Sequence, residues 1–369
     1  MEAVEELFQE GMRAFESQEY ETGLACFEKV LEVAPHNAYA WDGRGLCLAY
    51  LHRYSEAVDS FDRAIEFEVN ESRFWINRGM ALEENGDFEK AIASYDRALA
   101  IQPDLYELWN NRGTALFLLG RLNEAIANFE KVLEFNPDHY RALNNQGKVF
   151  TNLGRYNRAL ACYNKALAIE PEQQEILFGK AVVLAAMGRQ EAALAIYNKI
   201  IEINSNDDRI WINRGIVLSR LERYQESLDS LDRGLEINPN DSHSWGNRGV
   251  TLRRMGREQE AIAAYDRAIE CDPNNYEVWD NRGYALVKLR RYRDAIACFD
   301  KALAINGDRL NPIYNKGYCY AVQGKIKLAL EQLALAFSRE PRFREIAKTD
   351  PDLDPLRKNK RFQNLLKSG

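Results

Sequence analysis

The sequence predicts an all-α fold, a solenoid of ten helix-turn-helix repeats followed by a C-terminal capping helix. Three observations predict it. Glycine, aromatic residues and proline recur in one register, and ten repeats follow one another without an insertion or deletion. The six tryptophans are spaced by 34 residues or by three times that number: Trp41, Trp75, Trp109, Trp211, Trp245 and Trp279. A fixed period in this range is typical of stacked units that share one continuous core.

Each repeat is numbered so that its tryptophan is position 4. The repeats then begin at Val4, Ala38, Ser72, Tyr106, Tyr140, Gln174, Asp208, Ser242, Tyr276 and Leu310. Position 8 is glycine in nine repeats and Ala181 in the sixth, and position 24 is aromatic or leucine. Small residues at positions 8 and 20 let two helix backbones approach closely, and the large residue at position 24 fills the gap toward the neighbouring repeat.

Two helices per repeat follow from the spacing of these residues. Positions 4, 8 and 11 fall on one face of a first helix, and positions 20, 24 and 27 fall on one face of a second. A Gly-Arg pair separates the two helices in four repeats, beginning at Gly120, Gly154, Gly188 and Gly256. Its glycine is expected to adopt the left-handed conformation that ends the first helix. Proline at position 32 of seven repeats ends the second helix.

From Val4 to about Phe343 these signatures resemble the tetratricopeptide repeat family. The W-x-N-R-G form is similar in style to that of bacterial, including cyanobacterial, members. The resemblance implies a right-handed superhelix whose concave groove is lined by positions 2, 5, 6, 9, 12 and 13 of the first helices. The sequence departs from the family at position 7, which is usually leucine. That position holds Arg44, Arg78, Arg112, Arg214, Arg248 and Arg282, with Lys180 and Lys316 in two further repeats.

The expected domains are a ten-repeat array at residues 4–343 and a helical cap at residues 344–369. Leucine and phenylalanine residues of the cap are expected to cover the last helix of the array: Leu353, Leu356, Phe362, Leu365 and Leu366. Repeat 6 carries Leu177, Ala181 and Ser205 where most repeats have tryptophan, glycine and proline. It is either a weaker seam about which the halves flex or a case of neutral drift within a tolerant repeat.

Composition excludes several classes of protein. The formal net charge is −7, which argues against a nucleic-acid scaffold, although a local basic strip is compatible with it. No apolar run is long enough to span a bilayer, and the acidic start does not resemble a secretory signal. The six cysteines and four histidines show no metal-ligand spacing, which favours a reducing, cytoplasmic location with no metal and no cofactor. No phosphate loop or paired nucleophile is present, so we expect no enzyme.

Asparagine at position 6 is the sharpest candidate for a binding function. A row of side chains that each offer donors and an acceptor matches the backbone of an extended peptide. The alternative is that these amides bond neighbouring helices or solvent. The row consists of Asn77, Asn111, Asn145, Asn213, Asn247, Asn281 and Asn315, and it is broken in repeats 1, 2 and 6 by Gln9, Gly43 and Gly179.

Three further positions are expected to provide selectivity in the groove. Position 2 is basic in repeats 3, 5 and 7, position 13 becomes basic late in the array, and position 9 is mostly apolar or aromatic. The candidate residues are Arg73, Arg141, Arg209, Arg220, Arg254, Lys288, Tyr284 and Tyr318. The basic residues suggest an acidic ligand segment at repeats 7 to 9, and solvated helix faces are the alternative.

The family's carboxylate clamp for chaperone tails is absent, because no repeat has arginine at position 6 or asparagine at position 9. The expected function is therefore a non-enzymatic scaffold or assembly factor that binds an extended peptide or partner segment through the asparagine row. Two alternatives stay open. One is a self-assembling structural protein, and the other is a regulator that binds a nucleic acid or a small ligand through the basic residues of repeats 7 to 9.

Overall fold

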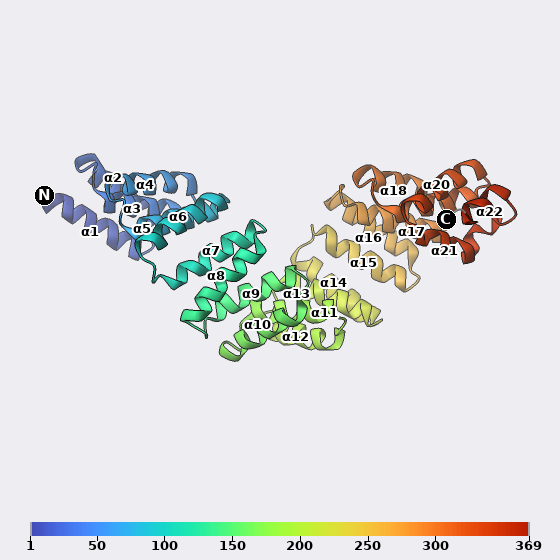
Figure 1. Ribbon diagram of the computed structural model, residues 1–369, viewed down its shortest axis with the longest axis horizontal. Coiled ribbons are helices and arrows are strands. Elements are labelled where there is room, and N and C mark those ends of the chain that lie inside the picture. The colour runs from blue at the N-terminus through green and yellow to red at the C-terminus, as the bar shows by residue number, and fades with distance from the viewer. Residues whose placement is uncertain (1, 368–369) are drawn as a thin grey trace. The chain divides into compact units, whose positions relative to one another are not determined.

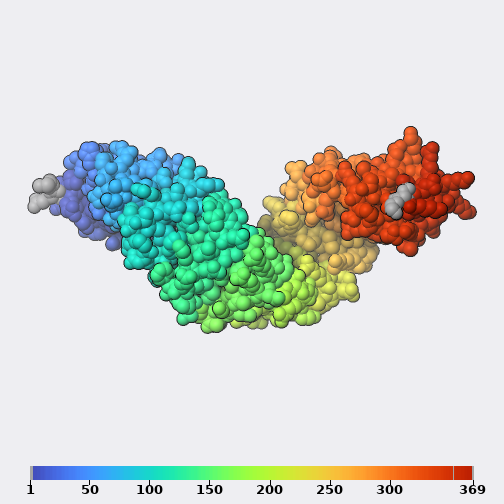
Figure 2. Space-filling model, viewed as in Figure 1, coloured from blue at the N-terminus to red at the C-terminus, as the bar shows by residue number. Residues whose placement is uncertain are grey.

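The computed structural model describes residues 2–367, and in this range the chain contains helices and no strand (Figure 1). The chain divides into two compact parts, an N-terminal half at residues 1–183 and a C-terminal half at residues 184–369. The division falls within the first helix of repeat 6. Figure 2 follows the two halves by colour, from blue to green and from green to red. The last two residues of the predicted cap, 368 and 369, lie outside the described residues.

Repeats 1 to 10 each form the predicted pair of helices. The first helices are α1 (Glu2–Glu16), α3 (Ala38–Tyr50), α5 (Ser72–Glu84), α7 (Tyr106–Leu118), α9 (Tyr140–Asn152), α11 (Gln174–Ala186), α13 (Asp208–Arg220), α15 (Ser242–Arg254), α17 (Tyr276–Lys288) and α19 (Leu310–Val322). The second helices are α2 (Tyr20–Val33), α4 (Tyr54–Phe67), α6 (Phe88–Ile101), α8 (Leu122–Phe135), α10 (Tyr156–Ile169), α12 (Gln190–Ile203), α14 (Tyr224–Ile237), α16 (Glu258–Cys271), α18 (Tyr292–Ile305) and α20 (Ile326–Arg339).

The turn between the two helices has the same backbone in all ten repeats. Position 15 is left-handed throughout, and the glycines expected there have φ between +68° and +77°. Four repeats place a residue with a side chain in this conformation, and those residues are Gln18, His52, Glu222 and Arg290. The register of the repeat therefore imposes the turn even where glycine, the residue best suited to it, is missing.

In nine repeats the core forms where the position 24 side chain meets the position 8 glycine of the same repeat. A Cβ added at Gly45 would lie 2.7 Å from the Phe61 ring, and one added at Gly113 would lie 2.7 Å from the Phe129 ring. Both rings are fully buried. The position 24 ring thus packs first on its own first helix, in addition to the contact with the next repeat that the sequence predicts.

The C-terminal segment packs against repeat 10. It consists of α21 (Arg342–Thr349), a 3₁₀ helix η1 (Pro351–Leu356) and α22 (Lys360–Lys367). Leu353, Leu356 and Phe362 are fully buried in one cluster with α19 and α20, and Leu365 and Leu366 pack against this cluster. The predicted boundary at residue 343 lies inside α21, which contributes Phe343 to the cluster. No helix within residues 2–367 combines the length and apolar character needed to cross a membrane.

Candidate functional site

The candidate residues lie on the first helices, whose positions 2, 5, 6, 9, 12 and 13 we call the first-helix face. All seven position 6 asparagines are half-buried on this face. They differ in what their amides bond, so each half of the chain is described separately.

In the N-terminal half the position 6 amides mainly join adjacent repeats. Asn77 Nδ2 donates to Asp42 Oδ1 at 2.8 Å, and Asn145 Nδ2 donates to Asn110 Oδ1 at 3.2 Å. Both acceptors are at position 5 of the preceding repeat. Asn111 forms no side-chain hydrogen bond with any described residue. Two of these three asparagines therefore bond the neighbouring repeat, as the alternative to peptide binding predicts.

In the C-terminal half the row divides into two pairs. Asn213 Nδ2 donates to the carbonyl of Arg209 at 2.8 Å, and Asn247 Nδ2 donates to the carbonyl of His243 at 2.8 Å. Each of these bonds lies within its own helix. The side-chain amides of Asn281 and Asn315, on α17 and α19, form no hydrogen bond with any residue that the structure describes, so they remain available to a ligand.

Glycine interrupts the row where the preceding repeat fills the space. A Cβ added at Gly179 would lie 2.8 Å from the Tyr163 ring, and a Cβ at Gly43 would meet the Phe27 ring even more closely. Both rings are position 24 residues of the repeat before. An asparagine at either glycine therefore requires the ring to move.

The position 2 arginines bind partners within the protein. Arg73 lies 3.3 Å from the buried carboxylate of Asp42, Arg141 Nε donates to Tyr140 Oη at 3.2 Å, and Arg209 pairs with Asp207 at 2.7 Å.

The position 13 residues also have partners within the protein. Arg254 Nη1 donates to the carbonyl of Ser219 at 2.9 Å, and Arg220 Nη1 reaches the carbonyl of Ala185 at 3.5 Å. These carbonyls belong to the last turns of the preceding first helices, which favour a positive charge. Lys288 lies 5.2 Å from the Tyr284 ring centre. Arg220 and Arg254 thus support the contact between successive first helices, which accounts for them without a ligand, whereas the contact of Lys288 lies within α17.

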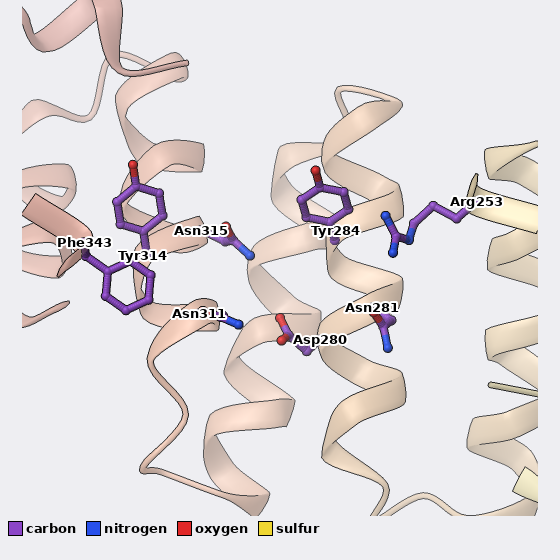
Figure 3. Close-up of a pocket in the computed structure, with 8 residues that line it drawn as sticks. All are labelled: Arg253, Asp280, Asn281, Tyr284, Asn311, Tyr314, Asn315 and Phe343. Carbon is purple, nitrogen blue, oxygen red and sulfur yellow. The ribbon is translucent and has the colours of Figure 1, made fainter. Parts of the chain in front are cut away.

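A pocket in the C-terminal half brings several of the predicted residues together (Figure 3). It has a volume of about 260 Å³, and its walls come from α15, α17, α19 and α21. It is lined by Arg253, Asp280, Asn281, Tyr284, Asn311, Tyr314, Asn315 and Phe343. Asn281, Asn315 and Tyr284 were predicted. Tyr318 does not line the pocket, because it packs edge-to-face against Tyr292 with ring centres 6.0 Å apart.

Asp280 gives this pocket its main electrostatic feature. Burial raises the pKa of Asp280 to about 6, Glu277 acts in the same direction, and Arg309 opposes the shift. Oδ1 of Asp280 is shielded from solvent and has no hydrogen-bond partner among the described residues. In Figure 3 the amide of Asn311 points toward this carboxylate. A buried acceptor without a donor is costly, so the pocket favours a ligand that brings one.

The cap closes one side of the pocket. The Tyr314 ring stacks on Phe343 with centres 5.1 Å apart, and the Tyr314 hydroxyl donates to Asp350 Oδ2 at 2.6 Å. Both partners belong to the C-terminal segment. Phe343 of the C-terminal segment and Tyr314 of α19 thus form an aromatic wall beside the polar groups, and the same segment covers the last repeat.

Sequence reasoning missed Arg253, Asp280, Asn311 and Phe343 as site residues. Asp280 is at position 5 and Arg253 at position 12, both on the predicted groove face. The available signal was that position 5 is polar in several repeats, as at Asp42 and Asn110. Sequence alone could not show that Asp42 has partners whereas Asp280 Oδ1 has none.

A second pocket, of about 340 Å³, lies in the N-terminal half and is more apolar. Phe8, Met12 and Leu46 form its apolar wall, and Met12 and Leu46 are position 9 residues as expected for side-chain pockets. Its polar side holds Asp42 and Arg73. Burial raises the pKa of Asp42, while the hydrogen bond from Asn77 and the charge of Arg73 oppose the shift.

The tryptophan and position 7 arginine, which the sequence marked without a role, join successive repeats. Trp245 Nε1 donates to the carbonyl of Pro239, position 32 of the repeat before, at 2.9 Å. Arg112 Nε donates to Asp96 at 2.8 Å in the preceding repeat, and its Nη1 donates to Asn128 at 3.0 Å in its own repeat. The same arginine contact to the preceding repeat recurs at Arg44, Arg78, Arg214, Arg248 and Arg282, and Lys316 makes a similar one.

The paired helices and their repeated contacts define a helical-repeat solenoid. Family models described as "Tetratricopeptide repeat" match residues 8–70, 72–105, 104–172, 152–214, 208–241, 243–275, 264–297 and 281–340. The chain belongs to the tetratricopeptide repeat family.

Solved structures share this fold. A tetratricopeptide repeat protein from Parabacteroides merdae ATCC 43184 is 23% identical, with 70% of this chain and 98% of that chain covered and a TM-score of 0.55. Yeast Tom70 is 14% identical, with 96% and 90% covered and a TM-score of 0.50. PilW, a type IV pilus biogenesis factor, is 22% identical, with 55% and 94% covered and a TM-score of 0.50. These likenesses show the fold alone. A search of curated protein sequences finds no match.

Proposed function

We propose that this protein is a non-enzymatic scaffold or assembly factor that binds an extended segment of a partner protein on its first-helix face. The observation that carries the proposal is the pocket of the C-terminal half. There the side-chain amides of Asn281, Asn311 and Asn315 have no hydrogen bond to a described residue, and Asp280 holds a buried, unpartnered oxygen. Members of this family generally bind proteins, which supports the class of partner.

The chemistry of the pocket suits a peptide. An asparagine amide accepts from a backbone N–H and donates to a backbone carbonyl, so Asn281 and Asn315 are suited to hold one extended strand regardless of its sequence. Asp280 accepts a further N–H from the ligand. Tyr284 and the wall formed by Tyr314 and Phe343 contact an apolar side chain. In this proposal only part of the asparagine row binds, because four of the other five amides have partners within the protein.

The compartment in the proposal is the cytoplasm. The cysteines are all free, and all except Cys271 are buried, which is consistent with a reducing environment.

The test compares two asparagine pairs of the same half. A peptide ligand is first selected from a random peptide library on the whole protein, and its affinity is then measured by calorimetry. We expect Asn281→Ala with Asn315→Ala to weaken binding by roughly tenfold or more, since each lost hydrogen bond costs about 1 kcal/mol.

The matched control is Asn213→Ala with Asn247→Ala, which removes amides already bonded within their own helices. We expect this control to bind like the wild type. Equal loss in both variants, or loss in neither, contradicts the proposal, provided that circular dichroism shows all three proteins equally helical.

A further inference from the structure

A second surface, away from the first-helix face, carries a concentration of positive charge. It lies at the turns between the two helices of repeats 9 and 10, where Arg290, Arg291, Arg293 and Lys325 surround a shallow hollow of about 510 Å³. We call these four residues the basic turn patch. All four side chains are exposed. Arg290 and Arg291 belong to the turn from α17 to α18, and Lys325 belongs to the turn from α19 to α20. Arg293 lies in the first turn of α18.

Most of this charge is not neutralised within the protein. Arg291 pairs with Asp294 at 2.7 Å, and Asp294 is the acidic residue lining the hollow. Within residues 2–367, Arg290, Arg293 and Lys325 form no ion pair with a carboxylate. The patch therefore keeps an excess of positive charge on a chain whose formal net charge is −7.

Other repeats neutralise the same turn. Position 16 is arginine in several of them, and a glutamate three residues later pairs with it. These pairs are Arg53 with Glu56, Arg121 with Glu124, Arg223 with Glu226 and Arg257 with Glu260. In repeat 10 the residue three positions after Lys325 is Leu328, so no acid faces the lysine. Repeats 5 and 6 also lack this acid, because Arg158 and Ala192 occupy its position. Repeat 9 keeps the pair of Arg291 with Asp294, and its excess charge comes from Arg290 and Arg293.

The backbone at Arg290 adds a second observation. Its φ is +59°, in a conformation for which six other repeats use glycine. A residue with a Cβ is disfavoured there. Four repeats lack glycine at this turn, and among them only repeat 9 has an arginine in the left-handed conformation. Arg291 and Arg293 lie beside it. The unfavourable backbone coincides with the concentration of charge.

We propose that the basic turn patch docks a segment of a partner protein rich in aspartate and glutamate. Arginine guanidinium groups bind carboxylates through paired hydrogen bonds, and Arg290 and Arg293 have no such partner in the protein. The patch is limited to two adjacent turns on an otherwise acidic chain. A nucleic acid would instead require a basic track along its backbone, so an acidic peptide fits better.

The experiment measures binding of a fluorescent oligoglutamate peptide to the full chain by anisotropy, at low and at physiological salt. The variant is Arg290→Gly with Arg293→Gln. We expect at least about a fivefold loss of affinity relative to the wild type, and weaker binding of the wild type as salt rises. An oligoglutamine peptide of equal length should not bind.

Glu222→Gly is the matched control, because Glu222 occupies the same left-handed position of repeat 7 with φ +62°. It makes the same backbone change without removing positive charge, so we expect it to bind oligoglutamate at least as well as the wild type. Unchanged affinity in the Arg290 and Arg293 variant overturns the proposal. Tighter binding of a single-stranded oligodeoxythymidine than of oligoglutamate also overturns it. The asparagine variants of the first-helix pocket should not affect this binding, so the two proposals fail independently.

Discussion

Asp280 holds a carboxylate inside the C-terminal half without a donor for Oδ1, and this makes it the most informative single residue of the pocket. The amides of Asn281, Asn311 and Asn315 line the pocket beside it without bonding this oxygen. The equivalent Asp42 of repeat 2, in contrast, is bonded by Asn77 and approached by Arg73. The same residue type at the same repeat position thus has hydrogen-bond partners in one repeat and a carboxylate oxygen without a donor in another.

The pH dependence of Asp280 follows from its burial, which raises its pKa to about 6 from an ordinary value of about 3.9. The folded state therefore binds the proton more tightly than the unfolded chain. The stabilisation that comes from this proton binding is fully present below about pH 4, and it is lost as the pH rises through 6. We expect Asp280→Asn to be more stable than the wild type by about 1 to 3 kcal/mol at pH 7 and equally stable near pH 4.

Urea unfolding at the two pH values measures this, with the exposed Asp59→Asn as a control that should not differ between them. A variant that is less stable than the wild type at pH 7 would show that the Asp280 carboxylate is satisfied. The same substitution is expected to weaken the selected peptide, because an amide oxygen accepts less strongly than a carboxylate.

At the scale of single elements, the helices and turns were predictable and the site only in part. Nine first helices begin at the first residue of their repeat, and the 34-residue register places the left-handed turn even at His52 and Glu222, where glycine is missing. The binding site depends instead on which partner each side chain finds in the next repeat. Asn77 and Asn281 share a position, and only the structure shows that one is bonded and the other is free.

We expect destabilisation of the cap to destabilise the pocket as well. Phe362 is fully buried in the cluster that also holds Phe343, the aromatic wall of the pocket. We expect Phe362→Ala to cost about 3 to 5 kcal/mol locally and to speed amide exchange in α19 to α22. Hydrogen exchange read by mass spectrometry tests this, with the exposed Lys358→Ala as control. Exchange unchanged outside α22 would show that the cap does not support repeat 10.

At the scale of the whole molecule, repeat 6 is where the compact parts divide and where the repeat pattern is weakest. The division falls between Val183 and Leu184, and Leu177 and Ser205 replace the tryptophan and the proline of other repeats. Because the stability of a solenoid is a sum of repeat and nearest-neighbour terms, we predict that residues 2–183 and 184–367 unfold as separate blocks.

Hydrogen exchange in increasing urea measures this prediction. We expect two groups of amides that become exposed to exchange at different urea concentrations. The boundary between the two groups should lie inside repeat 6. A single midpoint shared by all repeats would contradict it and would favour neutral drift as the explanation for the sixth repeat.

The bridges formed by the tryptophans and the position 7 arginines use only groups that most repeats supply, namely a position 32 carbonyl and an acid at position 25. The bridges of a repeat therefore do not depend on which of the other repeats precedes it. Duplication or loss of one whole 34-residue module would therefore leave the bridges intact on both sides, so that the array can change its length in evolution while each junction keeps the same chemistry.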